Sequence, residues 1–121
     1  MLELLKKHMP DVRGKKIGVL GLTFKPETDD IREAPSIKIV RELLKQGAVV
    51  KAYDPKAMDG FKKIFPKVKY CSAEEVLESD AVLILTEWDE FKKLDYLGKI
   101  VIDGRKIDEA KSARVYEGVC W

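Results

Sequence analysis

The chain has 121 residues, which is enough for one domain that buries about two-thirds of its unfolded surface without disulfides or metals. Its 23 basic and 21 acidic side chains nearly balance and are interspersed, a pattern that argues against a nucleic-acid-binding protein. No apolar run is long enough to span a membrane, and the first residues lack the apolar core of a signal peptide. Cys71 and Cys120 lie far apart and fit neither a disulfide framework nor a metal site. We therefore expect a soluble cytoplasmic domain that binds no metal.

The composition also indicates a high working temperature. The sequence has no Asn and a single Gln, Gln46, while Lys and Glu are abundant. Hyperthermophile proteins deviate in this direction. We therefore expect a protein from a thermophile.

Residues 1–9 predict a short amphipathic helix that ends before a proline. No Ser, Thr, Asp or Asn precedes this helix as a cap, so its start is abrupt. His8 is the only histidine of the chain. Because it lies on a terminal amphipathic helix, we interpret it as a surface residue and assign it no role.

A strand, a charged loop and a helix follow. Residues 15–21 are a β-branched run typical of a buried parallel strand, and residues 36–46 have apolar positions at helical spacing. The loop between them carries Lys25, Arg32 and two aspartates that can orient these cations, which suits an anionic, phosphate-bearing ligand. The spacing alone leaves a second interpretation open, because it matches neither G-x-G-x-x-G nor a P-loop. In that interpretation the glycines only permit strand-to-helix packing and the charges only solvate a turn.

The second predicted strand spans residues 48–53 and ends at Asp54. In a dinucleotide-binding Rossmann domain an acid at this point holds a ribose. Pro55 follows at once here, so a structural cap is favoured over a ribose ligand for Asp54.

The rest of the sequence alternates between helix and strand. Helices are predicted over residues 56–64, over the residues that follow a Ser72–Glu75 capping box, and over 87–97. Strands are predicted over residues 67–70, 81–86, 99–103 and 113–116, and the last of these is either a sixth strand or a terminal extension. Crossovers this long exclude hairpins. The sequence therefore predicts a Rossmann-like α/β fold: a doubly wound, mostly parallel five- or six-stranded sheet with helices on both faces, in the order 3-2-1-4-5.

This topology brings three strand ends to one rim of the sheet. Strand 1 ends at Phe24 and Lys25, strand 4 near Thr86 and strand 5 near Arg105. Lys25 and Arg105 can then reach a diphosphate from two sides, with Arg105 as a bidentate fork and Lys25 as a point charge. Phe24 can present an aromatic face to a base or sugar. Asp103 is placed either to orient Arg105 or to cap the turn.

Three motifs occur in this order along the chain. Residues 21–36 read G-L-T-F-K-P-E-T-D-D-I-R-E-A-P-S, residues 80–91 read D-A-V-L-I-L-T-E-W-D-E-F, and residues 102–105 read I-D-G-R. Together they resemble the C-terminal domain of the UDP-glucose/GDP-mannose dehydrogenase family over nearly the whole chain. The resemblance implies that residues 13–121 are a nucleotide-sugar (UDP)-binding domain. Residues 1–12 would be the remnant of an inter-domain helix and linker.

The resemblance also implies an activity. In that family the full enzyme has an N-terminal NAD-binding domain and a middle domain, and it oxidises the C6 alcohol of a UDP-sugar such as UDP-glucose to a carboxylate. It uses two NAD and a catalytic cysteine in a thiohemiacetal and thioester route. By the resemblance Phe24, Lys25 and Arg105 bind the substrate and Arg32 faces the NAD cofactor. Neither cysteine of this chain matches the catalytic position, so no catalytic residue is assigned and the chain alone is expected to be inactive.

Two further expectations concern partners. Without the N-terminal and middle domains, the apolar side of the first helix, with Leu2, Leu4 and Leu5, would be exposed, so we expect a homo-oligomer.

The alternative function is a stand-alone Rossmann-like nucleotide-binding or interaction module without catalysis. An upstream reading frame with G-x-G-x-x-G and the catalytic cysteine would favour the dehydrogenase.

Overall fold

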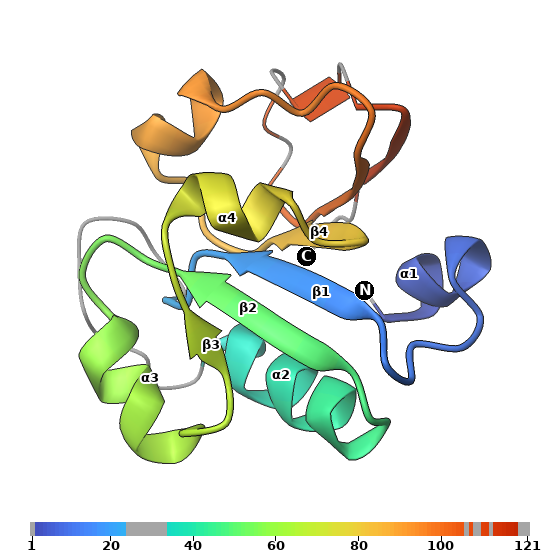
Figure 1. Cartoon of the computed structure of the whole chain (residues 1–121). Helices are drawn as coiled ribbons and strands as arrows, with labels where there is room; N and C mark the ends of the chain where they lie inside the picture. Colours follow the sequence, from blue (N-terminus) through green and yellow to red (C-terminus); the bar gives the residue numbers. More distant parts are fainter. Residues whose placement is uncertain (1, 24–33, 106, 108–109, 112, 119–121) are drawn as a thin grey trace.

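The computed structural model describes residues 2–23, 34–105, 107, 110–111 and 113–118. Within them the chain forms a six-stranded sheet in the order β3-β2-β1-β4-β5-β6, and every pairing is parallel (Figure 1). The strands are β1 (Lys16–Leu20), β2 (Val49–Tyr53), β3 (Lys69–Tyr70), β4 (Ala81–Ile84), β5 (Ile100–Asp103) and β6 (Val115–Gly118). The predicted Rossmann-like order is confirmed, and the sixth strand is present.

Helices cover both faces of this sheet, as predicted. They are α1 (Leu2–His8), α2 (Pro35–Lys45), α3 (Met58–Ile64), α4 (Ala73–Leu77) and the 3-10 helix η1 (Asp89–Lys93). Figure 1 shows α2 and α3 on one side of the strands and α4 on the other. The chain therefore crosses from one face to the other between β3 and β4, which is the doubly wound arrangement.

Two hydrophobic cores, one on each face, explain why the central strands are apolar throughout. On β4, Ala81 and Leu83 pack in the core with α1, α2 and α3, while Val82 and Ile84 pack in the core with α4 and η1. Successive side chains of a strand point to opposite faces, so a strand buried on both sides needs an unbroken apolar run. All four β4 residues are buried, which confirms the prediction of a central strand.

Helix α1 belongs to the first of these cores, which corrects one expectation. Leu5 is fully buried, and Leu2 and Leu4 pack against the same cluster. The apolar side of α1 is therefore covered within the chain itself, and it supplies no exposed patch for self-association. At the far end of α1, Lys7 and His8 each contact the Glu117 carboxylate of β6 at 3.1 Å.

Some helices begin or end at other residues than the sequence predicts. The helix predicted over 87–97 is only the 3-10 helix η1, because Trp88 is extended and the chain leaves the helix again at Leu94. The helix predicted from residue 56 begins at Met58. Ser72 does cap α4, since its Oγ accepts a hydrogen bond from the Glu75 backbone N–H at 3.3 Å. None of the helices in the described ranges has the length and apolar character that a membrane crossing requires.

Candidate nucleotide-binding site

The carboxyl ends of the central strands stay joined for one residue beyond the sheet. The Leu85 N–H donates to the Leu20 carbonyl at 2.9 Å, and the Gly104 N–H donates to the Ile84 carbonyl at 2.8 Å. These bonds hold the loops after β1, β4 and β5 side by side at the rim. The rim is the switch point where an open α/β sheet binds its ligand.

Three of the predicted site residues, Phe24, Lys25 and Arg32, lie outside the described residues. Their roles stay predictions. The described chain does show how the loop that carries them leaves the sheet, through Leu22 and Thr23 on one side and through the start of α2 on the other.

Leu22 and Thr23 are held by side chains from three different elements. The Leu22 N–H donates to Asp54 Oδ2 at 2.8 Å, and Ser36 Oγ donates to the Leu22 carbonyl at 2.7 Å. Thr86 Oγ1 donates to the Thr23 carbonyl. All of these bonds are buried, so water does not compete with them. The exit point of the loop is therefore fixed to β2, α2 and β4 at once.

Gly18 in β1 and Gly21 just after it are explained by close packing. A Cβ on Gly18 would lie 2.6 Å from the Val76 carbonyl oxygen of α4, and a Cβ on Gly21 would lie 2.5 Å from Thr86 Cβ. Gly21 also has a φ of +91°, which is strained for other residues. The packing interpretation left open by the sequence thus accounts for both glycines, and at Gly21 the packing shapes the rim itself.

Arg105 is the predicted site residue that the structure does describe. It is partly buried, and its Nε donates to the Leu85 carbonyl at 3.0 Å, so the guanidinium lies across the end of β4. Its backbone N–H donates to Asp103 Oδ1 at 2.7 Å. Arginine anchored through Nε can present a planar fork to an anion, which is the geometry suited to a diphosphate.

Asp103 is the residue that shapes the turn before Arg105. It is fully buried, and its Oδ2 accepts hydrogen bonds from the Ile107 N–H and, at 2.8 Å, from the Tyr116 hydroxyl of β6. Of the two predicted roles, capping the turn is confirmed. Asp103 acts on Arg105 through the backbone amide.

Asp54 is likewise a structural cap, as favoured from the sequence. Its carboxylate accepts bonds from the backbone N–H groups of Leu22, Lys56 and Ala57 at 2.8–2.9 Å. Its exposed fraction is 0%, so a ribose hydroxyl cannot reach it. Among the described residues the end of β2 therefore does not fit a dinucleotide ribose.

Thr86, Glu87 and Trp88 follow β4 and lie in different surroundings. Thr86 is the buried anchor of Thr23, Glu87 is exposed, and Trp88 packs in the core with α4 and η1. The sequence pointed to this motif but not to the anchoring role of Thr86. A small hydroxyl residue directly after a buried strand is the signal that could have suggested it.

The described residues include one free cysteine, Cys71. Burial raises the pKa of the Cys71 thiol, and the Glu75 carboxylate raises it further, so Cys71 is a poor nucleophile at neutral pH. Cys120 lies outside the described residues. No group of three His, Cys, Asp or Glu side chains within these ranges is placed to hold a metal ion.

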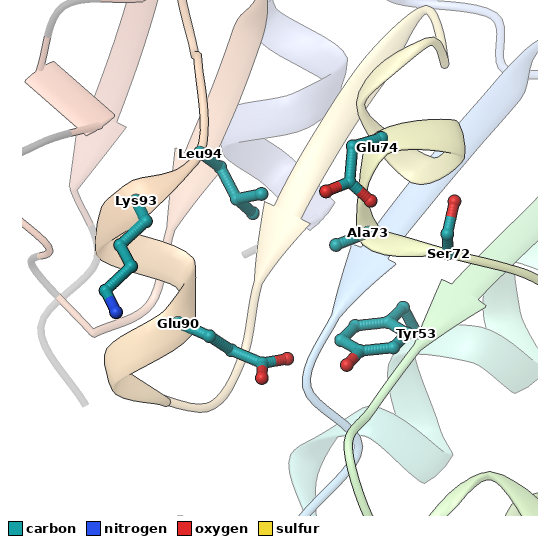
Figure 2. A pocket seen from close by; sticks show the side chains of 7 residues that line it. All are labelled: Tyr53, Ser72, Ala73, Glu74, Glu90, Lys93 and Leu94. Atoms are coloured by element: carbon teal, nitrogen blue, oxygen red, sulfur yellow. The ribbon is translucent and has the colours of Figure 1, made fainter.

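A cavity of about 340 Å³ opens at the same edge of the sheet, over the end of β2 (Figure 2). It is lined by Tyr53, Ser72, Ala73, Glu74, Glu90, Lys93 and Leu94. Arg105, the predicted site residue that the structure describes, does not line it. Sequence reasoning missed it because its walls come from β2, α4 and η1, which are distant in sequence.

Comparison with known proteins gives a consistent result. Residues 18–110 match the model of the UDP-glucose/GDP-mannose dehydrogenase family, UDP binding domain. The UDP-glucose 6-dehydrogenase AglM of Haloferax volcanii is 41% identical over 98% of this chain, which covers 29% of that protein. The UDP-glucose 6-dehydrogenase YwqF of Bacillus subtilis is 42% identical over 86% of this chain and 27% of its own length.

Solved structures agree with these relatives. A UDP-glucose dehydrogenase from the hyperthermophilic archaeon Pyrobaculum islandicum superposes with a TM-score of 0.94 at 41% identity, over 99% of this chain and 28% of that one. The UDP-D-ManNAc dehydrogenase of Pyrococcus horikoshii gives a TM-score of 0.72 at 31% identity, over 98% of this chain and 28% of its own. The chain thus spans less than a third of the length of the proteins it matches. Because the family model covers most of the chain, and the fold and motifs agree with it, this protein belongs to the UDP-glucose/GDP-mannose dehydrogenase family, as its UDP-binding domain.

Proposed function

We propose that this chain is the nucleotide-sugar-binding C-terminal domain of an NAD-dependent UDP-sugar 6-dehydrogenase of the UDP-glucose type. The single observation that carries the proposal is the position of Arg105, anchored to the Leu85 carbonyl at the rim between the ends of β4 and β5. The family membership gives the nucleotide as the ligand class, and Arg105 gives the described side chain that can bind its diphosphate.

Each predicted residue has a distinct task in this proposal. Arg105 donates two parallel hydrogen bonds to diphosphate oxygens, because its fork matches their spacing. Lys25 adds a point charge from the other side of the rim, and Phe24 stacks on the base or sugar. Asp103, Asp54 and Thr86 bind no ligand and keep the loop ends in register.

The cofactor has no site among the described residues of this chain. NAD accepts the hydride when it is bound, and Arg32 is proposed to face it. Asp54 is buried and saturated by backbone donors, so the end of β2 does not fit a dinucleotide here. The proposal therefore assigns NAD and the nucleophilic cysteine to the N-terminal and middle domains of the full enzyme. Residues 1–12 are proposed to be the remnant of the segment that joins those domains to this one.

We also propose a cytoplasmic location and a homo-oligomeric state. A cytoplasmic location fits a nucleotide-sugar substrate and the absence of a membrane-crossing helix among the described residues. A homo-oligomer stays proposed, although the apolar side of α1 no longer argues for it. The isolated chain is expected to show no NAD-dependent oxidation of UDP-glucose.

Titration of the chain with UDP tests the binding role. We expect a dissociation constant of about 1 mM, which corresponds to about −4 kcal/mol, with amide shifts at Gly104 and Arg105 in NMR spectra. Arg105→Ala should weaken binding at least tenfold, because hydrogen bonds to charged groups are worth about 1.5–3 kcal/mol. Arg105→Lys should weaken it less, since a point charge replaces the fork.

Two other arginines serve as controls. Arg114 is exposed near β6 and has no proposed role, so Arg114→Ala should leave UDP affinity unchanged. Arg32→Ala should have little effect, because its proposed partner is NAD. Equal losses in Arg32→Ala and Arg105→Ala, or UDP shifts that avoid Gly104 and Arg105, would show that the site is assigned wrongly.

A further inference from the structure

The cavity over β2 is separate from the nucleotide-binding rim. One of its walls is Tyr53 at the end of β2, whereas Arg105 follows β5, and the order β2-β1-β4-β5 puts three strand spacings between them. At about 4.8 Å for each spacing this is about 14 Å. Its volume of about 340 Å³ is at the lower end of the range for small-molecule sites.

One wall of the cavity is a fixed aromatic ring. Tyr53 makes an edge-to-face contact with the buried Phe91 of η1, with ring centroids 6.2 Å apart and planes at 65°. Ala73 and Leu94 complete the apolar part of the lining. A ring held in this way offers its face to a flat group without an entropy cost at the time of binding.

Two carboxylates from opposite walls make this aromatic wall electronegative. Burial, the hydrogen bond and charge of Glu90, and the charges of Asp54 and Glu74 together raise the pKa of Tyr53 to about 12. Figure 2 shows the Glu90 carboxylate turned toward the Tyr53 ring, with Glu74 reaching into the cavity from α4. Lys93 is the one cation among the described lining residues, and Figure 2 shows it on η1, with Glu90 between it and Tyr53 in this view.

We propose that this cavity binds a small organic cation, in which a flat apolar body carries an amidinium or guanidinium group. Tyr53 lies under the cation as an aromatic platform, and Glu74 and Glu90 are its counter-ions. A metal ion fits less well, because no group of three suitable ligands occurs among the described residues. An anion is disfavoured by the two carboxylates.

The probe for this site is benzamidine, and its uncharged counterpart benzamide is the matched control. We expect benzamidine to shift the amide signals of Ala73, Glu90 and Leu94 with a dissociation constant of about 1 mM, and to bind less tightly at high salt. Benzamide should bind at least fivefold more weakly.

Variants separate the site from general charge effects. Glu74→Gln and Glu90→Gln should each weaken benzamidine about two- to fivefold, which is the effect typical of an exposed ion pair. Glu78→Gln removes an exposed carboxylate at the end of α4 that does not line the cavity, so it should change nothing. Equal binding of benzamide, equal loss in Glu78→Gln, or inorganic phosphate shifting the same signals would overturn the proposal. UDP should leave these signals unmoved, so the test is independent of the nucleotide site.

Discussion

Replacing Gly21 by alanine tests whether close packing sets the shape of the rim. At Gly21 an added Cβ would lie 2.5 Å from Thr86 Cβ and Oγ1 and 2.7 Å from the Thr86 backbone N. Thr86 cannot simply move away, because its hydroxyl is bonded to the Thr23 carbonyl and is fully buried. We therefore expect the substitution to force the ends of β1 and β4 apart where the loop after β1 begins.

Gly98 is the matched control for this substitution. Its φ of +76° is also left-handed, but nothing lies within 4 Å of its added Cβ. The left-handed backbone costs about 1–2 kcal/mol at both positions, and the loss of unfolded-state freedom returns about 0.4–1 kcal/mol. Overlap with a packed neighbour adds about 1–3 kcal/mol at Gly21 alone. We expect Gly98→Ala to cost roughly 1 kcal/mol and Gly21→Ala about 2–4 kcal/mol.

Urea unfolding measures both costs as a shift of the midpoint at an unchanged m-value. The UDP titration then adds a functional readout, because displacement of Thr86 also displaces Thr23 and the loop that follows it. Gly21→Ala should weaken UDP binding, while Gly98→Ala should not. A cost at Gly21 no larger than at Gly98 would refute the packing explanation.

Three further predictions rest on other described contacts. Asp103→Asn should cost about 2–4 kcal/mol of unfolding free energy, since an NH2 group then faces a buried backbone donor. Tyr116→Phe should cost only about 1 kcal/mol, because it removes a single hydrogen bond to Asp103. A larger cost for Tyr116→Phe than for Asp103→Asn in urea unfolding would contradict the capping role. Burial holds the pKa of Tyr53 and Tyr70 at about 12, above the unfolded value of 10.0, so their neutral hydroxyls stabilise the fold fully below pH 10 and this stability is lost as the pH rises through 12. Unfolding midpoints that stay constant between pH 9 and 12 would exclude this linkage. The melting temperature should lie above the mesophile range of about 45–65 °C, as the composition predicts and as the 41% identity to a hyperthermophile structure supports; calorimetry showing a midpoint inside that range would remove the thermophile assignment.

The order of the sheet could be predicted because it depends on local patterns. Apolar runs at β1 and β4 had to be buried on both faces, and long crossovers between strands left a parallel sheet as the solution. The helix expected over 87–97 was wrong, because the chain is extended at Trp88 and again at Leu94 and only Asp89–Lys93 between them is helical. Tyr96 is fully buried in the core with α4 and η1, and its hydroxyl donates to the Phe91 carbonyl. The sequence pattern did not show this burial.

The sequence predicts where in the fold the candidate site lies, but it predicts few of the contacts within it. The motifs indicated which strand ends meet, and Arg105 lies at that rim. The short-range bond from the Arg105 N–H to Asp103 was among the predicted roles of Asp103. The bond from Arg105 Nε to the Leu85 carbonyl, 20 positions away, and the bond from Tyr116 to Asp103 follow from the tertiary fold. The roles of Phe24 and Lys25 stay predictions from the motif.

The bond between Ser36 Oγ and the Leu22 carbonyl joins the two ends of the segment between residues 23 and 35. Together with Asp54 and Thr86 it fixes both ends of the intervening segment to the sheet. When loop ends are already held together, doubling the loop length costs only about 0.6 kcal/mol of closure entropy. The segment between residues 23 and 35 can therefore be exchanged as a cassette. We expect a longer or chemically different loop between these fixed ends to leave the scaffold intact.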